Sequence, residues 1–80
     1  MRIISQNGKF DLPYENLAIF VEYENVIARF ENERYLLGQY SSEAKAIKAM
    51  EMLRKAWKFE TGIYHRNIIF QFPQDDERLN

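Results

Sequence analysis

The stretch Ser41–Phe59, SSEAKAIKAMEMLRKAWKF, decides the fold, because its apolar residues recur at three- and four-residue spacings along its length. This periodicity predicts an amphipathic helix with one apolar stripe and lysines away from that stripe. Ser41 or Ser42 is expected to cap the first turn, and Gly62 to end the helix. The residues of the stripe are Ala46, Ala49, Met50, Leu53, Ala56 and Trp57. Such a helix requires an apolar surface against which the stripe can pack.

Length and composition exclude several classes of protein and kinds of site. The chain has 80 residues, no cysteine and a net charge of −1. We expect a single domain, residues 1–80, near the size at which one core gives only modest stability. Without cysteine, neither a disulfide nor a thiolate metal site can form. The longest apolar run, Leu17–Val21, is too short to span a bilayer, so we expect a cytoplasmic protein with no membrane partner.

Strand patterns lie on both sides of the predicted helix. Asn7-Gly8 is a strong hairpin signal and pairs Arg2–Ser5 with Lys9–Leu12. Tight turns join three further segments into a predicted meander, and a closing strand and a frayed tail follow the helix. These segments are Leu17–Tyr23, Val26–Phe30 and Arg34–Tyr40, then Asn67–Phe72 and the tail 74–80. The expected fold is α+β: a small antiparallel sheet of about five to six strands, hairpin plus meander, with one long helix packed on one face.

A single helix covers only one face of such a sheet, which leaves the second face to meet another surface. The residues that alternation assigns to the second face are Phe20, Glu22, Ile27 and Arg29, with Tyr35 or Leu37 added according to the register. This face is too apolar to be left in water. We therefore predict a homo-oligomer that associates through this face, with Phe20, Ile27 and Tyr35 at its interface, or through the free edge of the sheet.

The residues needed for catalysis are sparse. His65 is the only histidine, and no serine has the flanking glycines of a nucleophile elbow. Gly8, Gly38 and Gly62 stand apart, which gives no phosphate-binding loop. The acidic run Asp75-Asp76-Glu77 is expected to be solvated rather than to bind a metal ion. We predict a protein that is not an enzyme and has neither cofactor nor metal.

Aromatic and basic side chains alternate just after the helix, and this mixture can stack a base and hold a phosphate. Tyr64, His65 and Arg66 are the ligand-binding candidates in this segment. Trp57 stands beside them but also belongs to the apolar stripe, so packing under the sheet is the favoured interpretation of that residue. For His65, the competing interpretation is an ordinary surface histidine.

Arg29 and Arg34 form a second candidate group on the strands. They can bind an anionic ligand bidentately at an oligomer face. Alternatively, one of them can pair with Glu22 across the strands. The helix lysines offer a further possibility, phosphate contacts to nucleic acid, but the net charge argues against it. Lysines on an exposed helix side also keep a protein soluble, and nucleic acid is not an expected partner.

Three segments carry a resemblance to a known family. They are MRIISQNGKFDLPYE at residues 1–15, KAMEMLR at 48–54 and FQFPQDDE at 70–77. These segments resemble an uncharacterised family of short proteins encoded by phages, prophages and mobile elements of Firmicutes, although the middle strands differ in length and sequence. The resemblance implies an accessory phage product in the host cytoplasm that counters host defence or binds a host protein.

The residues and the resemblance together suggest two functions. The first is a non-enzymatic binding module, an anti-defence protein that sequesters a nucleotide signal or blocks a host protein. The alternative is a structural or regulatory module for protein–protein interaction.

Overall fold

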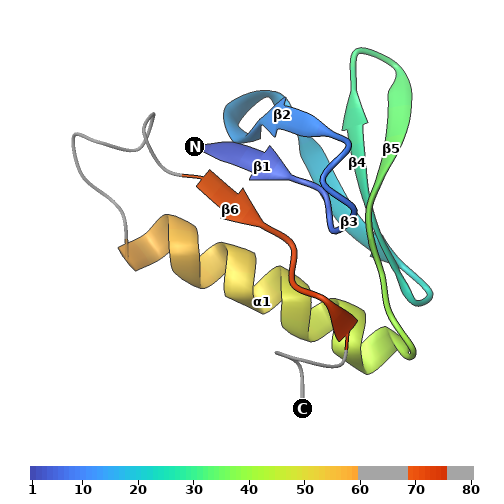
Figure 1. Cartoon of the computed structure of the whole chain (residues 1–80). Coiled ribbons are helices and arrows are strands. Elements are labelled where there is room, and N and C mark those ends of the chain that lie inside the picture. Colours follow the sequence, from blue (N-terminus) through green and yellow to red (C-terminus); the bar gives the residue numbers. More distant parts are fainter. Residues whose placement is uncertain (60–68, 76–80) are drawn as a thin grey trace.

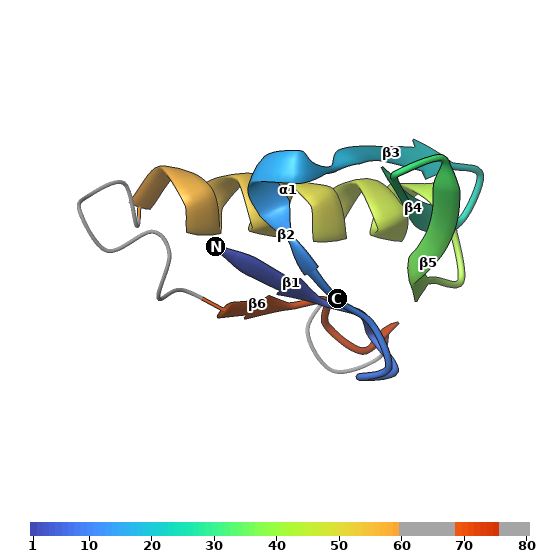
Figure 2. The same cartoon turned by 90° about the horizontal axis from the view of Figure 1, so that it is seen from above.

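The computed structural model describes residues 1–59 and 69–75, and of Phe59 only the backbone. The strands form two three-stranded sheets, with orders β2-β1-β6 and β3-β4-β5. Figure 1 shows the helix running along one side of both sheets, and Figure 2 shows the same arrangement from above. The elements are β1 (Arg2–Ile4), β2 (Asp11–Pro13), the 3-10 turn η1 (Tyr14–Asn16), β3 (Ala18–Glu22), β4 (Asn25–Phe30), β5 (Glu33–Gln39), α1 (Glu43–Phe59) and β6 (Ile69–Gln71). The predicted α+β class, hairpin, meander and long helix are confirmed.

The expectation of one antiparallel sheet is wrong. The strands divide into two sheets, and β6 pairs with β1 in parallel, with Arg2 opposite Ile69. Parallel pairing needs a long connection, and α1 lies within the connection that leads to β6. The backbone N–H of Gln6 donates to the carbonyl oxygen of Leu37 at 2.6 Å, so the loop after β1 touches β5.

The β1–β2 hairpin closes through the loop 6–9. The N–H of Ser5 donates to the carbonyl oxygen of Phe10 at 2.9 Å, and the N–H of Gly8 donates to that of Ser5 at 2.9 Å. Gly8 has a φ of 77°, a conformation that glycine adopts without strain. The Asn-Gly pair therefore marks the hairpin, although Gly8 lies inside the longer loop 6–9 instead of completing a two-residue turn.

A bulge in β5 determines which side chains enter the core. Val26 lies opposite Gly38 but Ile27 lies opposite Leu36, so Leu37 is an additional residue in β5. Leu37 and Tyr40 are three positions apart, and strict alternation would send them to opposite faces. Because of the bulge both are buried, with exposed fractions of 0% and 4%.

The hydrophobic core lies between α1 and the two sheets. The predicted stripe is confirmed at Ala46, Ala49, Met50 and Leu53, which are buried. Trp57 is partly buried at the edge of the core. The other core residues are Met1, Ile3, Leu12, Val26, Ala28, Leu37, Tyr40 and Phe72. This core places the second half of α1 opposite the start of β3.

Ser42 caps α1, because its Oγ accepts a hydrogen bond from the N–H of Lys45 at 3.2 Å. The predicted cap at one of the two serines is therefore confirmed, while the predicted stop at Gly62 lies outside the described residues. Within residues 1–59 and 69–75, no helix has both the length and the apolar character needed to cross a membrane.

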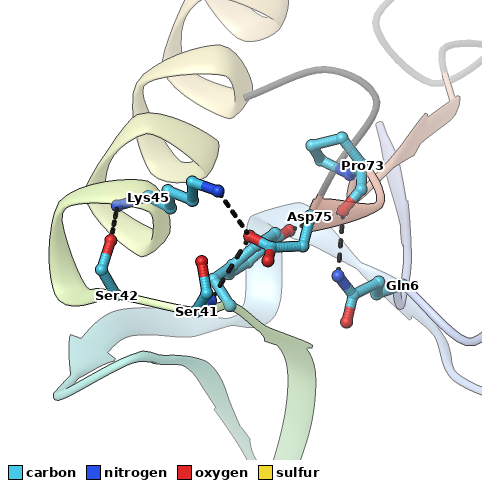
Figure 3. A network of polar contacts seen from close by, with 7 residues as sticks. Gln6, Ser41, Ser42, Lys45, Pro73 and Asp75 are labelled. Carbon is cyan, nitrogen blue, oxygen red and sulfur yellow. Dashed lines mark hydrogen bonds and ion pairs between the residues drawn. The ribbon is translucent and has the colours of Figure 1, made fainter. Parts of the chain in front are cut away.

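The chain after β6 is attached to the rest of the protein by hydrogen bonds (Figure 3). The carbonyl oxygen of Pro73 accepts from the Gln6 side chain at 3.1 Å, and Gln74 Nε2 donates to the carbonyl oxygen of Gln6 at 2.9 Å. Asp75 Oδ1 accepts from the N–H of Ser41 at 3.3 Å. The tail predicted to fray, 74–80, therefore begins with two hydrogen-bonded residues, and 76–80 lie outside the described residues.

Candidate functional site: a groove between the helix and β3

A groove of about 470 Å³ opens between the second half of α1 and the chain from η1 to β3. Its lining consists of Tyr14, Glu15, Leu17, Ile19, Met50, Leu53, Arg54 and Trp57. Leu17 and Ile19 contribute apolar surface from one side, and Met50 and Leu53 contribute it from the helix. The volume falls within the range of about 300–1,000 Å³ that is typical of small-molecule sites.

Tyr14 is held in place by the backbone around η1. Pro13 has a φ of −76°, which suits proline and ends β2 before the turn. The N–H of Tyr14 donates to the carbonyl oxygen of Met1 at 3.0 Å, and that of Leu17 donates to the carbonyl oxygen of Tyr14 at 3.2 Å. The first bond connects η1 to the residue before β1, the second closes η1, and the Tyr14 ring contacts Trp57 of the helix.

Tyr14 and Trp57 form an aromatic wall of the groove. Their ring centroids are 4.8 Å apart and the ring planes meet at 40°. This separation lies at the short end of the range for attractive aromatic pairs. The two interpretations of Trp57 are therefore compatible, because one partly buried ring packs against the core and also lines the groove.

Two opposite charges stand among the lining residues. Glu15 Oε2 lies 3.0 Å from the amino group of Met1, which neutralises part of its charge. Arg54 is exposed on α1. An apolar interior with a few charged groups is the pattern typical of small-molecule sites. Within the described part of the chain, no group of three or more histidine, aspartate or glutamate side chains is placed to hold a metal ion.

Of the predicted ligand-binding residues, those in the described part of the chain, Arg29 and Arg34, do not line this groove. Tyr64, His65 and Arg66 lie outside the described residues. Arg29 and Arg34 are cross-strand neighbours on β4 and β5, on the side of that sheet away from the core. The Arg34 guanidinium donates to Glu22 Oε1 at 2.8 Å and lies 5.8 Å from the centroid of the Phe20 ring. Arg34, and not Arg29, is thus the arginine that pairs with Glu22.

The side of the β3-β4-β5 sheet that points away from the core is here named the outer face. Phe20 and Ile27 are cross-strand partners there, as the alternation predicted. Tyr35 lies on the opposite face, because it pairs with the core residue Ala28 and its ring contacts Phe10 at a centroid distance of 5.1 Å. The placement of Tyr35 beside Phe20 and Ile27 was therefore wrong, and the β5 residue on the outer face is Leu36.

Sequence reasoning did not identify the groove, because its two sides are far apart in the chain. Tyr14 carries a weak signal, since an aromatic residue directly after Pro13 is well placed to point inward from a turn. Arg54 carries none, because it is one of several basic residues on α1. Comparison of the chain with protein-family models, with curated proteins and with solved structures finds no match in any of the three.

Proposed function

We propose that this protein is a non-enzymatic binding module whose groove takes a nucleotide, and that it acts as a phage-type anti-defence protein by sequestering a nucleotide signal. The observation that carries the proposal is the groove itself, in which the Tyr14–Trp57 ring pair stands beside Arg54. Aromatic rings and an arginine are the groups that stack a base and hold a phosphate.

The arrangement assigns a role to each part of the groove. The base lies against Trp57, where stacking is worth about 1–3 kcal/mol. Arg54 is exposed on the same side of α1 and donates to the phosphate. Leu17 and Ile19 exclude water from the inner side of the base. The pairing of Glu15 with the amino group of Met1 reduces the repulsion that its carboxylate would exert on the phosphate.

The lack of catalytic groups supports binding rather than turnover. The chain has no cysteine, and its only histidine is His65. No serine, threonine, cysteine or histidine is among the residues that line the groove. A bound nucleotide would therefore be retained and released unchanged, which is what sequestration requires.

Trp57 is the only tryptophan, so its fluorescence reports directly on the groove. We expect AMP, ADP-ribose or a cyclic dinucleotide to change this fluorescence saturably, with matching heat in calorimetry. Arg54→Gln is expected to weaken the binding about tenfold, because a charge-assisted hydrogen bond is lost. Lys55→Gln is the matched control, since it removes the same charge from the neighbouring position, outside the groove lining.

The result against the proposal is equally specific. If none of the nucleotides produces heat or a fluorescence change at millimolar concentration, the proposal that the groove binds a nucleotide is rejected. Equal weakening by Arg54→Gln and Lys55→Gln would instead indicate non-specific attraction to the basic helix. A stoichiometric host protein captured from lysate, without nucleotide binding, would favour the alternative of a protein-blocking or regulatory module.

A further inference from the structure

The outer face of the β3-β4-β5 sheet has an apolar row between two polar rows. The rows follow from the cross-strand pairing, which places residues of the three strands side by side. The apolar row is Phe20, Ile27 and Leu36; the basic row is Ala18, Arg29 and Arg34; and the acidic row is Glu22, Asn25 and Gln39. One surface therefore carries Arg29 and Arg34 on one side of an apolar centre and Glu22 on the other, and the Arg34 guanidinium reaches across to Glu22.

The apolar row is covered unevenly. Arg34 reaches over the Phe20 ring to Glu22, so this end of the row is shielded within the chain. Ile27 is 7% exposed, although it is not part of the core between the helix and the sheets. Leu36, at the other end of the row, is 42% exposed. The uncovered apolar surface therefore lies at Leu36.

We propose that two copies of the chain pack outer face against outer face, related by a twofold axis that runs along the apolar row. This axis reverses the strand direction of the second copy, so that each basic row lies over the acidic row of the other copy. An axis along the strands would place the basic rows on each other and bring the Arg29 side chains of both copies together. Like charges facing each other oppose association, so the charge pattern selects the axis along the row.

Arg29 provides the contact between the copies. It is exposed, and no ion pair is recorded for it among the described residues. In the proposed dimer it lies over Asn25 of the second copy and next to Glu22 of that copy. Arg34 uses Oε1 of Glu22, which leaves Oε2 to accept from Arg29 of the other chain. Asn25 Oδ1, on the same face, is buried without a hydrogen-bond donor in the described part of the chain.

The first test compares two apolar side chains with almost the same exposure. Leu36 is 42% exposed on the outer face, and Ile47 is 43% exposed on α1. Sedimentation velocity is expected to give wild-type protein twice the mass of a single chain. Leu36→Glu is expected to raise the dissociation constant about tenfold or more, because it puts a carboxylate at the apolar centre, whereas Ile47→Glu leaves it unchanged. Circular dichroism confirms that both variants are folded.

The second test fixes the orientation by exchanging charges. Arg29→Glu and Glu22→Arg each place like charges opposite each other in the proposed dimer, so each variant alone is expected to be a monomer. Mixed together, the two variants have opposite charges at both contacts and are expected to form a heterodimer. The double variant R29E/E22R is expected to associate with itself again.

Three results would overturn the inference. The first is wild-type protein that stays monomeric at the highest soluble concentration. The second is a dimer that Leu36→Glu and Ile47→Glu weaken equally, which would locate the interface elsewhere. The third is a dimer that Leu36→Glu dissociates, while the mixed Arg29→Glu and Glu22→Arg variants form no heterodimer. This result would reject the axis along the row.

Discussion

The phenol oxygen of Tyr40 donates a hydrogen bond to the carbonyl oxygen of Pro73 at 2.9 Å. The bond joins Tyr40, which follows β5, to Pro73, which follows the core residue Phe72. This hydrogen bond is buried. Gln6 Nε2 donates to the same carbonyl oxygen at 3.1 Å. The end of β5, the hairpin loop of the other sheet and the chain after β6 therefore meet at one acceptor. Figure 3 shows the Gln6 side chain at this oxygen.

Tyr40 is expected to make stability depend on pH in alkaline solution. Burial, and secondarily the negative charge of Asp75, raise the pKa of Tyr40 above its ordinary value. A raised folded-state pKa means that the unfolded chain loses its proton first, so the stabilisation is complete below about pH 10 and is lost as the pH rises further. We expect the free energy of unfolding to fall between about pH 10 and pH 11.5, and Tyr40→Phe to flatten that fall.

Urea unfolding of both proteins across this pH range tests the prediction. At neutral pH, Tyr40→Phe is expected to cost only about 1 kcal/mol, because Pro73 keeps its second donor, Gln6. Both proteins carry the same other titratable groups, so the comparison isolates Tyr40. Parallel curves for the two proteins would contradict the linkage.

Gly38 leaves space for the Tyr40 ring. A Cβ atom at this position would lie 2.8 Å from Cε2 and 2.9 Å from Oη of Tyr40. Gly38→Ala is therefore expected to push the ring away from Pro73 and to lower the free energy of unfolding by about 1–3 kcal/mol. In a Tyr40→Ala background the same substitution is expected to cost much less. A double-mutant cycle by chemical denaturation measures the coupling, and additive effects would show that the ring is not the cause.

Gln6 connects the two sheets through its side chain as well as its backbone. Gln6 Oε1 accepts from the N–H of Gln39 at 3.0 Å, while Nε2 donates to Pro73. Gln6→Ala removes both bonds and is expected to cost about 1–3 kcal/mol of unfolding free energy. Gln39→Ala is the matched control, because Gln39 contributes only its backbone N–H to this contact. Equal destabilisation by the two variants would mean that the side-chain hydrogen bonds of Gln6 do not contribute to the free energy of unfolding.

Asp75 is expected to protect the backbone at the start of the helix. Its Oδ1 accepts from the N–H of Ser41 at 3.3 Å and lies 3.8 Å from Lys45 Nζ. Asp75→Ala is expected to speed amide exchange at Ser41 several-fold, with a loss of about 0.5–1 kcal/mol, because partly exposed ion pairs contribute little. Asp11→Ala, which removes the exposed ion pair with Arg2, serves as the control. An unchanged amide exchange rate at Ser41 would show that Asp75 does not protect this N–H group.

The sequence located most of the elements, because periodicity and turn chemistry act over short distances. The spacing from Ala46 to Leu53 predicted the buried side of α1, and the structure confirms it. The Asn7-Gly8 pair located the hairpin, although not its turn type. The bulge at Leu37 was not visible, because a single additional residue leaves the strand pattern of β5 looking regular.

The candidate groove was beyond the reach of the sequence. Tyr14 and Trp57 carry no local mark of their contact, and only the packing of α1 beside β3 brings their rings to 4.8 Å. Tyr35 was assigned to the wrong face because the face of a strand depends on a register that neighbouring residues do not specify. The exposure of Leu36 could not be predicted either, because it depends on the same register.

By itself, then, the sequence determined where most of the helix and strand segments lie, and which side of the helix is buried, because these follow from the spacing of apolar residues along the chain. The tertiary structure alone decided that the strands divide into two sheets, that β6 runs parallel to β1, and that Tyr14 meets Trp57. The physical reason is that such contacts depend on how separate elements pack, and the free energy of packing belongs to pairs of surfaces rather than to any one segment.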